Sequence, residues 1–71
     1  MKKITAGLYQ HYKGPQYQVI EVAQHSETLE HLVVYRALYG EYGLWVRPLE
    51  MFAEVIEYEG QSVERFRRVS D

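Results

Sequence analysis

The fold is decided by LVVYRALY-GEYG-LWVR, residues 32–47. Residues 32–39 are rich in β-branched and aromatic side chains, which favour strands. The next four, Gly40-Glu41-Tyr42-Gly43, carry a glycine at each end, as hairpin loops often do, and residues 44–47 return as the partner strand. We therefore predict a β-hairpin with its loop at residues 40–43.

Strand-like segments continue on both sides of this hairpin. Residues 6–12 and 16–23 form one predicted pair, and residues 55–58 and 63–69 form another. Residues 48–52 begin with proline, which favours the first position of a short helical or 3₁₀ turn. We expect an all-β protein of five to six short antiparallel strands with one such turn. Closure of the sheet would hide its edges, so the predicted form is a small SH3-like barrel.

The length and composition limit the organisation of the chain. It has 71 residues, a formal net charge of −2 and no cysteine. This predicts one small domain, residues 1–71, with a thin core, as a monomer or a weak homodimer. Disulfides and thiolate zinc sites are excluded. No segment resembles a signal peptide or a bilayer-spanning helix, so we expect a cytoplasmic protein without a membrane partner.

Four blocks of the sequence resemble a family of short bacterial proteins known only as a domain of unknown function. They are GLYQHYKG (residues 7–14), AQHSET (23–28), VYRALYG (34–40) and WVRPLEMF (45–52). The resemblance extends from residue 7 to about residue 69. It implies a bacterial module, and it implies no activity, cofactor or site residues. The function must be argued from the residues themselves.

The predicted hairpin brings two arginines together. A loop at residues 40–43 places Arg36 opposite Arg47, on the same face as Trp45. Two guanidinium groups in this arrangement repel each other unless a carboxylate or a bound anion lies between them. Beside an indole, the pair is suited to a carboxylate or a phosphate. The alternative is that internal glutamates such as Glu21 or Glu50 satisfy both arginines.

Tyrosine is unusually frequent, with seven in the chain. So many rings exceed what a small core can bury, so some must lie at the surface. An exposed cluster that includes Tyr9, Tyr12, His11 and Trp45 would form a recognition groove for a peptide or a stacked base. The alternative is that the rings plug the open ends of the barrel.

A polar segment between two predicted strands contains imidazole and carboxylate groups: His25, Glu27, Glu30 and His31. Their spacing matches no strong metal-binding motif, and such a segment is more often a solvated turn. We predict no metal. A small enzyme that uses His25, Glu27 or Glu30 as acid or base is the least favoured function, because adjacent side chains do not normally converge as a catalytic set.

Basic residues gather at the two ends of the chain: Lys2, Lys3 and Lys13, then Arg65, Arg67 and Arg68. In SH3-like barrels the first and last strands are commonly neighbours, which would join these residues into a patch. A nucleic-acid accessory module that contacts phosphates through this patch is therefore an alternative. The negative net charge makes it less favoured.

Together, these patterns predict a non-enzymatic binding module for a peptide or a small anionic ligand, with no cofactor. The predicted ligand-binding residues are Arg36, Arg47, Trp45, Tyr9, Tyr12, His25 and Glu27.

Overall fold

The strand-forming segments of the sequence are strands in the structure, a computed structural model that describes residues 4–70. In chain order the elements are β1 (Gly7–His11), β2 (Gln16–Gln24), β3 (His31–Ala37), β4 (Leu44–Pro48), α1 (Leu49–Phe52), β5 (Val55–Tyr58), β6 (Gln61–Glu64) and β7 (Phe66–Ser70). The predicted all-β class and the short helical turn after β4 are confirmed. No helix within residues 4–70 is long and apolar enough to cross a membrane.

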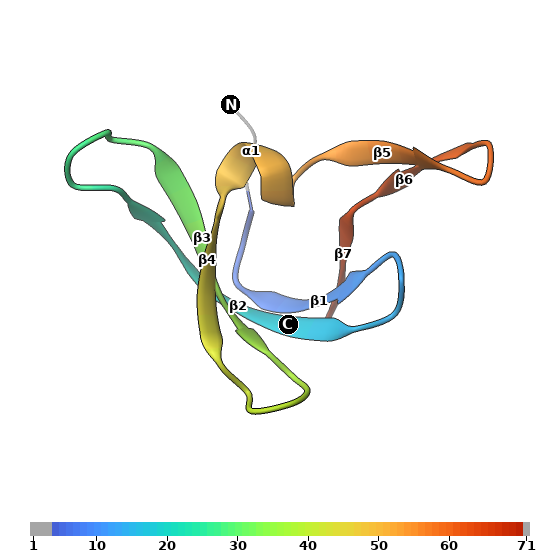
Figure 1. The fold of residues 1–71 in the computed structure, drawn as a ribbon, viewed down its shortest axis with the longest axis horizontal. Helices are drawn as coiled ribbons and strands as arrows, with labels where there is room; N and C mark the ends of the chain where they lie inside the picture. Colours follow the sequence, from blue (N-terminus) through green and yellow to red (C-terminus); the bar gives the residue numbers. More distant parts are fainter. Residues whose placement is uncertain (1–3, 71) are drawn as a thin grey trace.

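Five strands form one antiparallel sheet in the order β4-β3-β2-β1-β7. Consecutive hairpins join β1 to β4, and β7 returns to pair with β1, so the first and last strands are neighbours as expected. The register between β2 and β3 shifts between Val19 and Glu21. Such a bulge bends a strand and increases its twist. Figure 1 shows the resulting strong curvature, with α1 above the hollow of the sheet.

The sheets do not close into the predicted barrel, and the last predicted strand is divided between them at Arg65. The amide of Arg65 donates to the carbonyl of Glu54 (2.9 Å), and its carbonyl accepts from the amide of Tyr12 (3.0 Å). The strand is therefore split in two. β6 pairs with β5 in a separate hairpin that projects beside the main sheet, and β7 pairs with β1 (Figure 1). Residues 4–70 thus contain seven strands rather than five to six.

The core lies on the concave face of the main sheet, below α1. Its buried members are Tyr9, Val19, Val33, Tyr35, Leu49, Phe52 and Phe66. Pro48 ends β4 and leads into α1, whose buried residues are Leu49 and Phe52. The rings of Phe52 and Phe66 stack 4.1 Å apart and almost parallel. The core therefore consists largely of aromatic rings on the concave face of the strongly curved main sheet.

Candidate functional site

The two arginines that were predicted to face each other are separated. In the β3–β4 ladder Arg36 lies opposite Leu44, and Arg47 lies opposite Val33. The predicted Arg36–Arg47 pair is therefore wrong. Neither arginine forms an ion pair within residues 4–70, so the glutamates considered as its internal partners do not take that role either.

The reason for the error is the length of the hairpin loop. It spans residues 38–43, from the end of β3 to the start of β4, and the amide of Ala37 bonds to the carbonyl of Gly43 (3.0 Å) across its base. Gly40 and Tyr42 adopt positive φ angles of 62° and 57°, the left-handed conformation that lets this longer loop turn back. Arg36 consequently faces Leu44, three residues before Arg47. An odd shift of register exchanges the two faces of a strand.

The exchange brings Trp45 and Arg47 onto the concave face. Trp45 lies opposite Tyr35, and both side chains stand on the same side of the sheet. Arg36 points to the other side, where its Nη1 donates to the carbonyl of Tyr42 (2.8 Å). Of the residues predicted to form the Arg/Trp/Tyr face, Trp45 and Arg47 are together and Arg36 is not.

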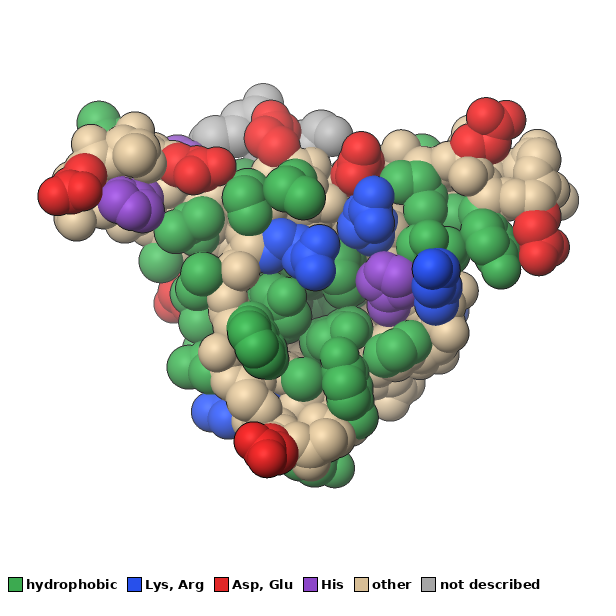
Figure 2. All heavy atoms as spheres, in the orientation of Figure 1, with side chains coloured by type: hydrophobic (Ala, Val, Ile, Leu, Met, Phe, Trp, Pro, Cys, Tyr) green, Lys and Arg blue, Asp and Glu red, His purple; other side chains and the backbone are tan. Residues whose placement is uncertain are grey.

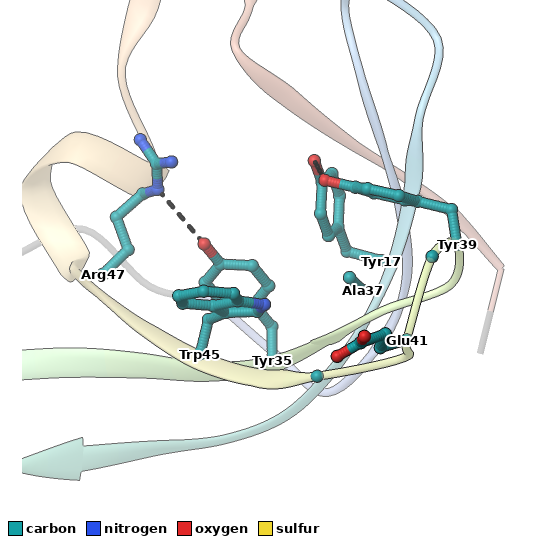
Figure 3. A pocket seen from close by; sticks show the side chains of 9 residues that line it. Tyr17, Tyr35, Ala37, Tyr39, Glu41, Trp45 and Arg47 are labelled. Atoms are coloured by element: carbon teal, nitrogen blue, oxygen red, sulfur yellow. Dashed lines mark hydrogen bonds between the residues drawn. The ribbon is translucent and has the colours of Figure 1, made fainter.

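A pocket of about 440 Å³ opens in front of these residues, lined chiefly by Tyr17, Tyr35, Tyr39, Glu41, Trp45 and Arg47. In Figure 3 the Tyr35 and Trp45 rings lie on one side of the pocket, and Tyr17 and Tyr39 lie on the other. Ala37, opposite Tyr17 in the β2–β3 ladder, has too small a side chain to fill the floor between them. The side chain of Trp45 is 59% exposed, so its ring is open to a ligand.

Contacts among three tyrosines hold the two sides of the pocket together. The ring of Tyr17 meets those of Tyr35 and Tyr39 edge-on, at centroid distances of 5.3 and 5.7 Å. The hydroxyls of Tyr17 and Tyr39 form a hydrogen bond of 3.0 Å. Burial, together with this bond, raises the pKa of Tyr17 to about 12. The phenol is therefore neutral at physiological pH. It lines the pocket with a hydroxyl group that forms hydrogen bonds.

Arg47 lies at one end of the pocket. Its Nε donates to the hydroxyl of Tyr35 (3.4 Å), and its guanidinium carbon lies 5.5 Å from the ring centroid of Phe66. No carboxylate of the described residues comes within ion-pair distance of it. Glu41 lies toward the opposite end (Figure 3). The pocket is thus polarised, with its cationic and anionic side chains at different ends.

Tyr9 and Tyr12 do not line this pocket. Tyr9 is only 4% exposed and belongs to the core, where its hydroxyl donates to the carbonyl of Thr5 (2.9 Å). The ring of Tyr12 packs against His11 (4.5 Å) and Tyr58 (5.0 Å), toward the β5–β6 hairpin. The tyrosines that do form the pocket are on β2, β3 and the β3–β4 loop.

His25 and Glu27 lie in the loop between β2 and β3, away from the pocket residues. The Nδ1 atom of His25 accepts from the amides of Glu27 (3.1 Å) and Thr28 (3.3 Å). The imidazole thus stabilises the turn, and these two local hydrogen bonds account for the position of the His25 side chain. No group of three or more His, Cys, Asp or Glu side chains within residues 4–70 is placed to hold a metal ion.

The sequence reasoning missed Tyr17, Tyr39 and Glu41 as site residues. Tyr39 is the last residue of a predicted strand, because the prediction starts the loop at Gly40, two residues later than the structure does. A usable signal was present in Ala37, a small side chain in a strand otherwise made of large ones. A small residue among rings predicts an opening in a concave face.

Comparisons with known proteins agree with this fold. The sequence profile of a family described as "Protein of unknown function (DUF1653)" matches residues 7–68. A crystal structure of a DUF1653 protein from Bordetella bronchiseptica is similar at a TM-score of 0.87 and 33% sequence identity, over 96% of this chain and 90% of that one. A search of curated proteins gave no match. These similarities establish the fold and the family, and neither description names a ligand or an activity.

Proposed function

The chain belongs to the DUF1653 family, whose description assigns no activity, and we propose that it is a non-enzymatic module that binds a small anionic ligand or the anionic end of a peptide. The ligand's planar or apolar part lies in the aromatic pocket, and its anionic group pairs with Arg47. The observation that carries this proposal is the position of Arg47 at the end of an open aromatic pocket, with no carboxylate of residues 4–70 as its ion-pair partner.

The size and lining of the pocket support a small ligand. About 440 Å³ is within the range of about 300 to 1,000 Å³ that is typical of small-molecule sites. Rings offer a large contact area at a low cost in conformational entropy. The exposed indole of Trp45, opposite Tyr17 and Tyr39, is suited to cover one flat group (Figure 3).

The charges of the pocket support one orientation of that ligand. The contacts of Arg47 with Tyr35 and Phe66 fix the guanidinium before any ligand arrives. A fixed planar guanidinium can bind a carboxylate or phosphate oxygen pair through two parallel hydrogen bonds. Glu41 repels an anion at the other end. We therefore expect the anionic group at the Arg47 end.

The chemistry of the lining favours binding over catalysis. A general acid or base works best when its pKa lies near the working pH. The phenol of Tyr17 has a pKa of about 12, far from that range. His25 and Glu27, the residues weighed for an enzyme, lie in another loop. The pocket itself offers rings, backbone groups, one carboxylate and one guanidinium.

The nucleic-acid alternative stays a prediction. The β1–β7 pairing brings the beginning of the main sheet beside the strand that carries Arg67 and Arg68, as this alternative requires. Lys2 and Lys3 lie outside the described residues. Alternation along β7 places Arg67 on the face of the sheet opposite Phe66, so this arginine does not face the aromatic pocket.

Fluorescence of Trp45, the only tryptophan, can test the proposal. Three probes distinguish the aromatic contact from the ionic contact. Benzenesulfonate carries a ring and a negative charge, benzyl alcohol carries a ring without a charge, and methanesulfonate carries the charge without a ring. We expect a saturable change with benzenesulfonate, and much weaker responses to the other two. Arg47→Gln should weaken benzenesulfonate binding by about tenfold, the worth of a charge-assisted hydrogen bond.

The matched control is Arg67→Gln, which removes the same charge from the other face of the sheet and should leave binding unchanged. Equal responses to all three probes would contradict the proposal. So would an equal loss in the two arginine variants, because long-range attraction rather than the pocket would then explain binding.

A further inference from the structure

His11 and Arg47, which are far apart in the sequence, meet at the ring of Phe66. The imidazole of His11 meets this ring edge-on at 4.9 Å, and the guanidinium carbon of Arg47 lies 5.5 Å from its centroid. Phe52 stacks on Phe66 at 4.1 Å and covers part of that ring from the core side. In Figure 2 a histidine and several Lys and Arg side chains gather beside the central hollow.

Two further cations extend this group. The amide of Tyr12 bonds to the carbonyl of Arg65, which holds the segment before β7 against the end of β1. The ring of Tyr12 packs on His11, and the ammonium of Lys13 lies 5.7 Å from the same Tyr12 ring. We call His11, Lys13, Arg47 and Arg65 the basic cluster.

The electrostatics of the basic cluster act on His11. Its pKa is lowered from the ordinary 6.5, first by burial and then by the positive charges of Arg65, Arg47 and Lys13. One carboxylate offsets this charge, since Glu54 accepts from Nη2 of Arg65 at 2.8 Å. Three permanent cations against one carboxylate leave the cluster with an excess of positive charge.

The tautomer of His11 is set by a neighbouring amide. Its Nδ1 atom accepts from the backbone N–H of Lys13 (3.1 Å), so in the neutral ring the proton is on Nε2. The neutral imidazole thus presents a donor through Nε2. Protonation of Nδ1 would require the Lys13 amide to give up this bond, and a nearby anion would have to compensate.

We infer that the basic cluster is an anion subsite of the aromatic pocket, that its ligand carries a dianionic oxyanion of the phosphate-monoester class, and that binding takes up a proton on His11. This inference rests on the proposed function. Burial is the first cause of the lowered pKa of His11, and the neighbouring cations are the second. An anion at Arg47 offsets this second cause, so binding and protonation favour each other.

The charge of the basic cluster favours a tetrahedral dianion over a carboxylate. A planar carboxylate has two oxygens, and one guanidinium such as that of Arg47 can satisfy both. A carboxylate bound to Arg47 alone would leave the remaining positive charge of the basic cluster unbalanced. A phosphate monoester has three terminal oxygens and up to two negative charges, so it can accept from Arg47 and from Nε2 of His11 at once.

The first experiment measures the pKa of His11 by NMR, with and without saturating benzenesulfonate. This probe keeps one negative charge across the titration, so its own ionisation cannot mimic the effect. We expect the probe to raise the pKa of His11 and to bind about fivefold more tightly at about pH 5 than at about pH 8. His11→Asn keeps an acceptor for the Lys13 amide and should abolish this pH dependence.

The matched control is His25→Asn. His25 makes the same local bond, Nδ1 accepting from the amide two residues ahead, in a loop outside the pocket. This variant should keep the full pH dependence. An equal loss in both variants would contradict the role of His11. Because the NMR titration uses the unaltered chain, it decides the question even where a variant folds poorly.

The second experiment tests the ligand class at about pH 8, where phenyl phosphate is dianionic. It should bind about fivefold more tightly than benzoate or benzenesulfonate. Methyl phenyl phosphate, a diester with the single charge of a nucleic-acid backbone, should bind no better than benzenesulfonate. Equal binding of the monoester and the diester would overturn the phosphate-monoester class.

The outcomes separate this inference from the proposed function. If benzenesulfonate changes the Trp45 fluorescence while the pKa of His11 stays constant, the subsite is wrong and the proposed function stands. If none of the aromatic anions binds, both are wrong.

Discussion

Arg47 donates a hydrogen bond to the hydroxyl of Tyr35, although its direct neighbour across the β3–β4 ladder is Val33. The bond is therefore diagonal, along the strand direction on the concave face. It draws the guanidinium along the wall of the pocket toward Phe66, where it lies against the ring. A cation fixed by two contacts loses less entropy on binding an anion than a free surface arginine does.

Trp45→Ala should leave the fold nearly unchanged while binding is lost. The side chain is 59% exposed, so truncation removes little buried area, and we expect a loss of less than about 1 kcal/mol in the free energy of unfolding. Urea unfolding followed by circular dichroism measures it. A loss of about 3 kcal/mol or more, typical of a buried tryptophan, would show that the indole is a core residue.

Phe52→Ala should destabilise the protein severely. Phe52 is fully buried and stacks on Phe66 at 4.1 Å, and truncation of a buried phenylalanine costs about 3 to 5 kcal/mol. Met51→Ala is the control in the same helix, because Met51 is 47% exposed. The thermal unfolding midpoint should fall strongly for Phe52→Ala alone. Similar midpoints for the two variants would contradict the described core.

Gly43 and Gly40 provide a matched pair of loop variants. A Cβ on Gly43 would lie 3.2 Å from Nε1 of Trp45, so Gly43→Ala should displace the indole and shift its fluorescence. At Gly40 a Cβ meets no atom, but φ is +62°, and alanine there should cost about 1 kcal/mol of stability. We therefore expect a spectral change from the first variant and a stability loss from the second. The reverse result would contradict the described contact between Gly43 and Trp45.

The stability of the unliganded protein should depend on His11 in mild acid. The folded chain binds a proton at His11 more weakly than the unfolded chain, whose pKa is near 6.5. The stabilising effect of neutral His11 is thus complete above that pH, and it is lost as the pH falls through the lower folded pKa. Urea midpoints in buffers free of phosphate and sulfate should decline over this range, and less so for His11→Asn. Parallel declines in both proteins would assign the loss to other groups.

Much of the fold could be predicted from local patterns. The segment from Gln16 to Gln24, the proline before α1 and the turn at residues 59–60 each carry an unambiguous local preference. Arg65 carries none. Its backbone hydrogen bonds to Glu54 and Tyr12 continue the registers of the β5–β6 and β1–β7 ladders by one residue each, so the passage of the chain from β6 to β7 at Arg65 is a tertiary effect.

The site was less predictable, because it depends on one register. The composition pointed to an Arg/Trp/Tyr face, and Trp45 and Arg47 do share a pocket with tyrosines. Which arginine and which tyrosines take part depends on where the hairpin loop begins. The loop begins two residues before Gly40, and within it Tyr42 adopts the left-handed conformation, which tyrosine rarely does. No local preference at Tyr42 predicted that conformation.

The most direct test of the central claim, that the concave pocket binds an anion with a ring, is an NMR titration of the ¹⁵N-labelled protein with benzenesulfonate. The account predicts that the indole N–H of Trp45 and the Nε–H of Arg47 shift together and saturate at one concentration. Signals of Arg67 on the other face of the sheet should stay in place. If the Trp45 and Arg47 signals do not move, or if saturable shifts occur only at the β5–β6 hairpin, the proposed site is contradicted.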